Sequence, residues 1–564
     1  MATNMKKAIS TTKLLLAMVV AVALYTTAAH AAAPGITGPT FNLVAQSAYI
    51  TQPDGQMIYS WGYGCNGTPA GFAPSAISNT FCNTMQIPGP TLIVTEGQTV
   101  TVNLTNSLPT AAGNTSILFP GFQVTAHGVA PNAISPCAKA PAGLLTTEVK
   151  PGCTVQYTFT ASSPGTRAYY SGTQGDLQVE MGLYGAIIVL PNSSNAPTCP
   201  SHSTYAGVDP TTGKLVAGGE QDFRLSTTHA AYHVPGSCYD REYLFQFSEM
   251  DPRIHTQAEA QVLDPNRIAA CKAGPTAPGC SLAVATEPYH PAYFMINGRS
   301  MPDDMDPNYA PEYPHQPYNG NPHMHPGDLT LIRVIGQGRW QHPFHEHGNH
   351  VRILARDGNL ILSSTNPGET NLAGPLLFTT TTTPGLAFDG IFYWTGKGLN
   401  WDAYGHNPTS NDPLAKLPCT PDSNGYNTGD PSAVNYYEWC QDHNKPVQGA
   451  PFGDVAGGGP VTLPDPNLFT NGAWYGGSPY LGPDATLRAT GCSSDPLANP
   501  PSCGSSGSTP PSGTIANSPS SEAGFAFMWH SHNEREITTN NIFPGGMLMM
   551  MLVDSREFVI DESN

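Results

Sequence analysis

Two short histidine clusters, far apart in the chain, hold the side chains best suited to metal chemistry. The first reads His342-Pro343-Phe344-His345-Glu346-His347-Gly348, and the second reads Trp529-His530-Ser531-His532. Side chains two residues apart on an extended strand point to the same face. His345 and His347 therefore aim at one point, as do His530 and His532, if the two strands are neighbours. Four such imidazoles predict a transition-metal site, with copper as the first expectation and zinc or another divalent ion as alternatives.

Residues around these histidines suggest further roles. Glu346 and Glu534 are candidates to orient the ligand histidines or to hold a proton. A second, weaker site is expected on the opposite face of the strands, from His342, Glu536 and Met547. The alternative is that the clusters are hydrogen-bonded remnants of an ancestral site without a metal. Two H-x-H pairs favour metal binding over that alternative.

The order of these motifs resembles that of the multicopper oxidases. In that family, H-P-x-H-x-H-G precedes an H-x-H near the C-terminus, which a Gly- and Met-rich strand follows, as residues 545–553 do here. The resemblance implies an oxidoreductase in which a blue copper accepts electrons from a substrate and a trinuclear copper cluster reduces dioxygen. It assigns the four clustered histidines to the trinuclear cluster, and His342 and Met547 to the blue copper.

The chain departs from the family pattern at both kinds of copper site. Ser531 stands where the family has the blue-copper cysteine, and Glu536 stands where it has the second blue-copper histidine. The first two histidine motifs of the family are also replaced. Their positions hold Leu118 and Pro120 within Ser116–Gly121, and Tyr170 and Gly172 in Tyr170-Ser171-Gly172. Half of the cluster ligands and the thiolate are therefore missing, and ordinary four-electron laccase chemistry is not expected.

The composition of the chain and its strand-like segments predict that β-sandwiches position these residues. Gly and Pro number 58 and 55, and only 11% of residues are charged, which favours an all-β protein. Strand-like segments near residues 88–104 and 168–189 have late counterparts at 325–334 and 528–553, which indicates duplication. We expect three consecutive cupredoxin-like Greek-key domains, at 32–195, 196–320 and 321–564, with a long loop insertion at about 400–523.

The N-terminus and the cysteines indicate export. Lys6 and Lys7 precede a short apolar run, and Ala29-His30-Ala31 offers a cleavage site, so residues 1–31 read as a signal peptide. No later stretch is apolar and long enough to span a membrane. The twelve cysteines are expected to form local disulfides in an oxidising compartment, either the periplasm or the extracellular space. The near neighbours in sequence are Cys65/Cys82, Cys137/Cys153, Cys199/Cys238, Cys271/Cys280, Cys419/Cys440 and Cys492/Cys503.

These observations predict an exported copper-binding protein of multicopper-oxidase type. Its expected partners are a metal ion, dioxygen and a small reductant, either a phenol or a metal ion. A net charge of −18 argues against nucleic acid. Two alternatives remain open from the residues alone: a non-catalytic protein that sequesters copper or another divalent ion, and a structural surface protein on the same fold. The sequence does not decide the oligomeric state or whether the protein turns over a substrate.

Overall fold

The computed structural model describes residues 33–73, 82, 84–199, 222–397, 418–429, 435–443, 523–554 and 560, together with four short strands at 206–208, 215–217, 477–481 and 515–516. The expected signal peptide, most of the expected insertion and the pair Cys492/Cys503 lie outside these residues. In the described part, the chain is mostly β-sheet. Among the same residues, no helix has the length and apolar character needed to cross a membrane.

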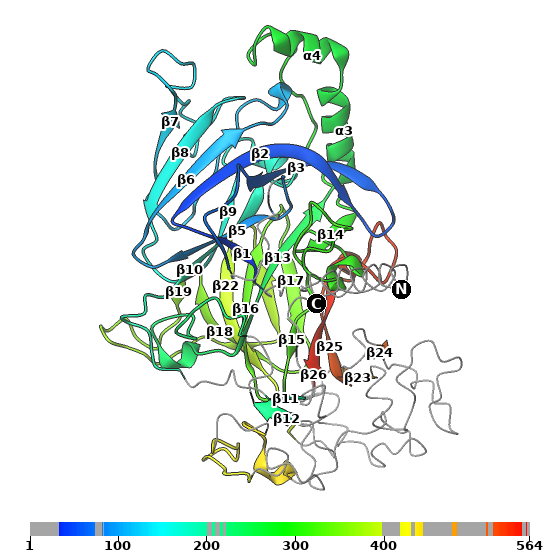
Figure 1. Cartoon of the computed structure of the whole chain (residues 1–564). Helices are drawn as coiled ribbons and strands as arrows, with labels where there is room; N and C mark the ends of the chain where they lie inside the picture. Colours follow the sequence, from blue (N-terminus) through cyan, green and yellow to red (C-terminus); the bar gives the residue numbers. More distant parts are fainter. Residues whose placement is uncertain are drawn as a thin grey trace, which may run out of the picture.

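The N-terminal part folds into a sandwich of two five-stranded sheets (Figure 1), with strand orders β4-β1-β5-β10-β9 and β3-β2-β6-β8-β7. Its strands are β1 Gly35–Thr37, β2 Thr40–Thr51, β3 Met57–Cys65, β4 Phe72–Ala73, β5 Gly89–Thr95, β6 Thr99–Asn106, β7 Thr125–Val129, β8 Thr154–Thr160, β9 Gly165–Tyr170 and β10 Tyr184–Leu190. In β6, the alternating Val100, Val102 and Leu104 are buried in the core between the sheets. This is the alternation that the sequence predicts for a half-buried strand.

The second sandwich consists of two seven-stranded sheets and carries both histidine clusters. One sheet has the order β14-β13-β16-β22-β18-β19 with β20 beside β18, and the other has β15-β26-β25-β17-β21 with β23 and β24 beyond β25. Its strands are β13 Arg241–Met250, β14 Tyr293–Ile296, β15 His323–Met324, β16 Leu329–Gly336, β17 His342–Glu346, β18 Val351–Arg356, β19 Asn359–Leu360, β20 Leu376–Leu377, β21 Thr379–Thr382, β22 Ala387–Tyr393, β23 Gly477–Leu481, β24 Ile515–Ala516, β25 Ala523–Ser531 and β26 Leu548–Asp554.

The expected division into three sandwiches needs correction, because the described strands form two. β13 and β14, which were expected in a middle domain, are hydrogen-bonded in the same sheet as β16. The reason is that β13 is buried along its whole length. Phe245 packs into the core of the second sandwich, whereas Leu244 packs against Ile93 of the N-terminal sandwich. β13 therefore lies between the two sandwiches. Because β13 and β16 share a sheet, the expected boundary at residue 320 does not separate two sheets. The rest of the middle segment includes the short pair β11 (Ala206–Val208) and β12 (Leu215–Ala217).

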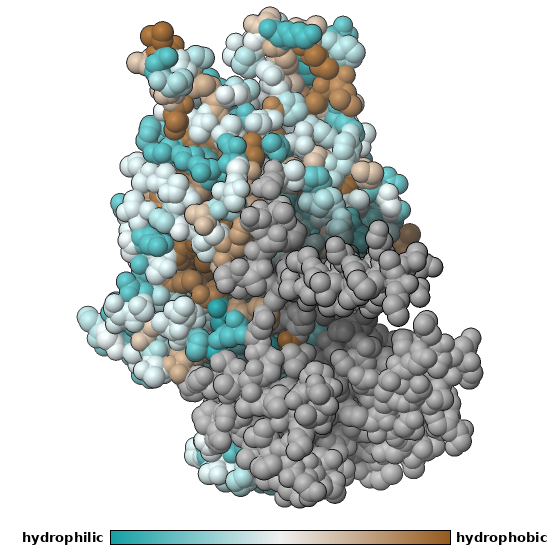
Figure 2. All heavy atoms as spheres, viewed as in Figure 1, coloured by the Kyte–Doolittle hydropathy of each residue, from teal (hydrophilic) through white to brown (hydrophobic). Residues whose placement is uncertain are grey.

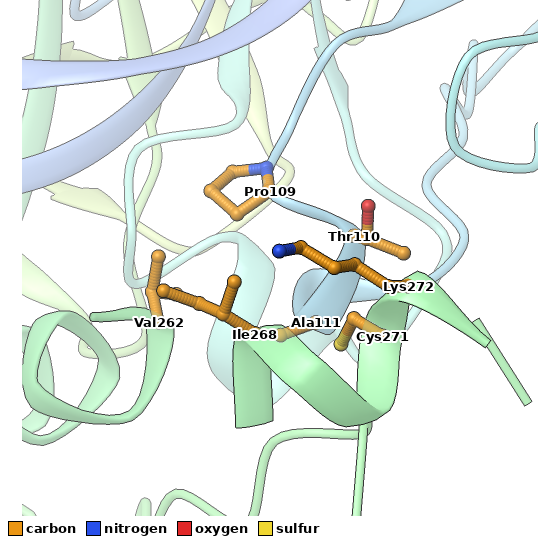
Figure 3. A pocket seen from close by; sticks show the side chains of 7 residues that line it. All are labelled: Pro109, Thr110, Ala111, Val262, Ile268, Cys271 and Lys272. Carbon is orange, nitrogen blue, oxygen red and sulfur yellow. The ribbon is translucent and has the colours of Figure 1, made fainter. Parts of the chain in front are cut away.

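Two helices that the sequence analysis did not foresee lie between β13 and β14. α3 spans Pro252–Val262 and α4 spans Pro265–Lys272. Each begins with an Asp-Pro pair, in which the Asp251 or Asp264 carboxylate accepts a hydrogen bond from the second backbone N–H after it. α3 lies against β3, and α4 lies against the short 3-10 helix Thr110–Ala112, with a hollow of about 240 Å³ beside it (Figure 3). Figure 2 shows hydrophobic residues on the surface of this helical end of the molecule.

The two sandwiches are joined by a buried polar network. Asp389 on β22 accepts hydrogen bonds from the backbone N–H and the hydroxyl of Thr166 on β9, at 3.2 and 2.6 Å. Tyr232 also donates to Asp389. Arg333 on β16 lies 3.6 Å from Asp389 and forms a 2.9 Å ion pair with Glu242. Arg333 is therefore held by two carboxylates, and Asp389 also accepts hydrogen bonds, which lowers the cost of burying these charges.

Five of the six expected disulfides lie in the described residues, and all five are formed. They are Cys65–Cys82, Cys137–Cys153, Cys199–Cys238, Cys271–Cys280 and Cys419–Cys440. No described cysteine is free. None of these residues can therefore supply a thiolate to a metal site.

Candidate metal centre

The two histidine clusters lie on neighbouring antiparallel strands. β17 pairs with β25 so that His345 stands opposite His530 and Phe344 stands opposite Ser531. Phe344 points inward and packs against Trp529, with ring centroids 6.0 Å apart. Because alternate residues point to opposite faces, the ligand histidines lie on the outer face of this sheet.

Three of the four histidines converge. One ring nitrogen of each of His345, His347 and His530 lies within 4.8 Å of the others. The fourth, His532, is exposed, and its ring centroid lies 4.8 Å from that of His345. His345 itself is only 2% exposed. The result is a cluster of imidazoles with a buried base and an open rim.

Neighbouring groups hold these rings in place. Nδ1 of His345 lies 2.6 Å from the hydroxyl of Thr379 on β21, and Nδ1 of His530 donates to the backbone carbonyl of Ser531 at 2.7 Å. The indole N–H of Trp529 donates to the backbone carbonyl of His347 at 3.0 Å. With Nδ1 engaged, Nε2 is the atom of His530 that faces the cluster. Such outer hydrogen bonds fix the tautomer of metal-binding histidines.

The spacing and protonation of the rings suit a metal ion. Nε2 of His530 and Nε2 of His347 are 3.2 Å apart. Two imidazole nitrogens that bind one ion at about 2.0–2.1 Å stand about 3.3 Å apart at a tetrahedral angle. Burial and the neighbouring imidazoles lower the pKa of His345 to about 4, and burial lowers the pKa of His530. Both rings are therefore neutral near pH 7, as metal ligation requires.

The two glutamates near the clusters occupy different environments. Glu346 is fully buried on the inner face, where it accepts a 3.5 Å hydrogen bond from Thr380. Burial raises its pKa well above the ordinary range, which favours the protonated form. Glu534 is exposed in the first turn of the 3-10 helix Glu534–Ile537. Neither carboxyl group has a hydrogen bond to a ligand histidine within the described part of the chain.

His342 lies on the inner face, clamped between two carboxylates. Its Nδ1 lies 2.8 Å from Oε2 of Glu536, and its Nε2 lies 2.8 Å from Oε2 of Glu249. Both carboxylates raise the pKa of His342 to about 9, against the effect of burial, so the ring is charged at neutral pH. Ser531 donates a 2.5 Å hydrogen bond to the same oxygen of Glu536.

This arrangement surrounds the expected second, weaker metal site at His342, Glu536 and Met547, which stays a prediction. Both ring nitrogens of His342 face carboxylates, with which an ion would have to compete, and Met547 is buried in the apolar core. Sequence reasoning missed Glu249 and Thr379. Glu249 reaches His342 from β13 in the opposite sheet, and no local motif marks it.

The positions expected for the first two histidine motifs do meet in space. Leu118 and Tyr170 form an antiparallel bridge in the N-terminal sandwich. No histidine stands at either position, and neither residue belongs to the cluster around His345. The N-terminal sandwich thus contributes no imidazole to the metal centre in this chain.

A second group of metal-type side chains lies far from these histidines in sequence. Cys419, Glu438 and His443 place one ligand atom each within 4.8 Å of the others. Cys419 is bonded to Cys440, however, and Nδ1 of His443 lies 2.8 Å from Glu438. A disulfide sulfur is not a thiolate ligand, so this group is an ion pair beside a disulfide.

Comparison with known proteins links the N-terminal sandwich to one family. Residues 74–194 match the family model described as multicopper oxidase. An L-ascorbate oxidase from Brassica rapa subsp. pekinensis is 38% identical over 104 residues, which is 18% of this chain and 16% of that protein. The laccase abr2 from Aspergillus fumigatus is 28% identical over 154 residues, which is 27% of this chain and 23% of that protein. The alignments thus span less than a quarter of these relatives.

Solved structures give a weaker likeness over a longer stretch. A blue copper oxidase from Nitrosomonas europaea aligns with 91% of this chain and 85% of its own, at 15% identity and a TM-score of 0.40. The multicopper oxidase mgLAC aligns with 91% of this chain and 86% of its own, at 14% identity and a TM-score of 0.40. The family match itself implies copper as the cofactor.

Proposed function

We propose that this chain, which belongs to the multicopper oxidase family, is an exported copper-binding oxidoreductase that takes electrons from a small phenol or a metal ion. The observation that carries the proposal is the convergence of His345, His347 and His530 within 4.8 Å on neighbouring strands. Imidazole ligation suits copper, which also binds most tightly among the first-row divalent ions. Copper at these imidazoles would supply one-electron redox chemistry.

The side chains around the centre have separable tasks. The Thr379 hydroxyl and the Ser531 carbonyl orient the rings of His345 and His530. The buried base at His345 excludes water from one side, and the exposed rim at His532 leaves the other side open to a small molecule. A site of this kind can hold an ion firmly while a small reductant or dioxygen reaches it.

Oxygen uptake tests the proposal. Copper-loaded wild-type protein is expected to consume dioxygen with 2-methoxyphenol or Fe(II) as the reductant. His530→Ala should lose this activity, and His350→Ala should keep it, because His350 is exposed and packs against Phe378 outside the cluster. Uptake no faster than that of free copper, from protein with stoichiometric bound copper, would refute the oxidase.

A second candidate is a non-catalytic protein that sequesters copper. It is favoured by Ser531, which gives no thiolate for electron transfer, and by Leu118 and Tyr170, which stand where family members carry ligands. The same preparation separates the two functions. A sequestering protein retains copper against a chelator and consumes no dioxygen with either reductant.

Export to the periplasm or the extracellular space is part of the proposal. The five disulfides in the described residues support it, because structural disulfides persist in oxidising compartments. Expression of the full chain with its own N-terminus should yield a processed protein that begins near residue 32. An unprocessed chain retained in the cytosol would contradict this part of the proposal.

A further inference from the structure

A hollow of about 240 Å³ lies between the two sandwiches, and none of the four clustered histidines lines it. The N-terminal sandwich contributes Leu118, Leu145, Tyr170 and Val179, and the second sandwich contributes Gly338 and Pro384. Leu118 and Tyr170 are two of the positions at which the family resemblance places missing histidines.

Glycines keep this space open. A Cβ atom on Gly172 would lie 2.8 Å from Cγ of Leu118, and one on Gly338 would lie 2.5 Å from a carboxylate oxygen of Glu249. Gly338 also has a φ of +66°, a conformation that favours glycine. Larger side chains at these two positions would need the walls to move. Glycine at these two positions therefore allows the close packing at the edge of the hollow.

The lining suits a neutral ligand with one polar group. Leu118, Val179 and Pro384 offer apolar walls, and no Asp, Glu, Lys, Arg or His is among the lining residues. Tyr170 is half-buried, and its hydroxyl makes no hydrogen bond with any described residue. A charged ligand would lose its hydration without gaining an opposite charge here, whereas a neutral alcohol can pair with Tyr170.

Two exposed leucines lie on a turn beside the hollow, and one of them, Leu145, lines it. Leu144 and Leu145 form the tip of a turn and are 95% and 64% exposed. The turn is closed by hydrogen bonds from Gly143 N–H to the Thr146 carbonyl and from Glu148 N–H to the Pro141 carbonyl, both 2.9 Å. Leu145 lines this hollow and an adjoining one of about 420 Å³. Covering such exposed apolar side chains with a ligand removes apolar surface from water, which favours binding.

We propose that this hollow binds small neutral aromatic alcohols, with the ring between Leu118, Val179 and Leu145 and the hydroxyl at Tyr170. An apolar cavity of about 150 Å³ in another protein holds benzene, so about 240 Å³ suits a single substituted ring. This proposal goes beyond the proposed function, because binding here needs no metal. It can hold whether or not the protein is an oxidase.

Calorimetry and ligand-detected NMR on the metal-free full-length protein test this site. The probes are 2-methoxyphenol, methoxybenzene and benzoate. We expect 2-methoxyphenol to bind and benzoate to show no binding, because its carboxylate meets no cation in the lining. Tyr170→Phe should weaken 2-methoxyphenol binding and leave methoxybenzene binding unchanged. Failure of 2-methoxyphenol to bind, or equal binding of benzoate, would overturn the proposal.

A matched pair of surface variants locates the site. Leu145→Asp should weaken 2-methoxyphenol binding about fivefold to tenfold, through loss of apolar contact. Leu263→Asp changes a leucine of similar exposure, 61% against 64%, at the C-terminal end of α3 and outside the lining of the hollow, and should leave binding unchanged. Both side chains are exposed, so both variants should fold, which circular dichroism verifies. Equal affinity of Leu145→Asp and wild type would place the ligand elsewhere and refute the assignment.

Discussion

At the scale of single residues, the chemistry available to a side chain depends on the face of the strand from which it projects. His345 and His530 point outward and keep neutral imidazoles available to an ion. One residue away, Ser531 points inward and hydrogen-bonds to Glu536. The outer face therefore preserves a metal centre, and the inner face holds a charged network in place of a blue copper.

Replacing one of the converging histidines should weaken copper binding. His345→Ala removes the buried ligand at the base of the site, and we expect the Kd for Cu(II) to rise at least about tenfold, because loss of even an outer partner costs that much. Calorimetric titration measures the change. His350→Ala is the matched control, since His350 is exposed and outside the cluster. Equal affinities in the two variants would contradict the assignment of His345 as a ligand.

Restoring the cysteine should not restore a blue copper. In Ser531→Cys, both ring nitrogens of His342 still face Glu249 and Glu536, and the second family histidine is still absent. We expect neither the wild type nor this variant to show the intense blue absorption of a copper–thiolate bond when loaded with copper. An intense blue band in the wild type would show that another residue supplies a thiolate.

At the scale of elements, the pairing of β17 with β25 creates the centre, and the sequence predicted which residues share a face. The period-two rule placed His345 and His347 together, and His342 on the other side, without knowledge of the partner strand. The sequence could not supply Glu249, because it comes from β13 in the opposite sheet. Contacts across a sandwich leave no spacing in the chain from which to predict them.

The clamp on His342 makes the stability of the second sandwich depend on pH. The folded pKa of about 9 lies above the ordinary value of 6.5, so the charged ring stabilises the fold fully below about pH 6.5 and loses this effect as the pH rises through 9. The difference corresponds to about 3 kcal/mol.

Chemical denaturation at pH 6.5 and 9.5 tests this dependence. The free energy of unfolding of the wild type should fall between these pH values by about 3 kcal/mol more than that of His342→Gln, which cannot titrate. His350→Gln serves as the control for loss of an exposed histidine and should follow the wild type. Parallel pH profiles for the wild type and His342→Gln would show that the clamp is not charged.

At the scale of the whole molecule, the two sandwiches pack against each other across one interface. The sequence predicted the all-β character and the strands of the N-terminal sandwich, because their alternation is clear. It did not predict that β13 joins the second sandwich, because β13 is buried on both faces yet mixes apolar residues with Glu242, Gln246 and Glu249, and this pattern indicates no partner sheet. The Asp-Pro pairs at the beginning of α3 and α4 are sequence signals for the start of a helix.

The interface predicts a large cost for removing Asp389. In Asp389→Ala, Arg333 loses one of its two carboxylate neighbours, and Thr166 and Tyr232 lose their acceptor. Breaking a buried charged network of this kind costs about 3–5 kcal/mol, measured as the free energy of unfolding in denaturant. The control is Asp176→Ala, whose exposed carboxylate accepts one hydrogen bond from Thr286. Equal stability of the two variants would show that the network does not hold the sandwiches together.

X-ray absorption spectroscopy of the copper-loaded protein tests the central claim most directly. We expect a copper edge with nitrogen scatterers from imidazole and no sulfur scatterer, and loss of that signal in the variant His345→Ala/His347→Ala/His530→Ala. A copper–sulfur shell, or the same imidazole signal in the triple variant, would show that the ion does not bind at these histidines.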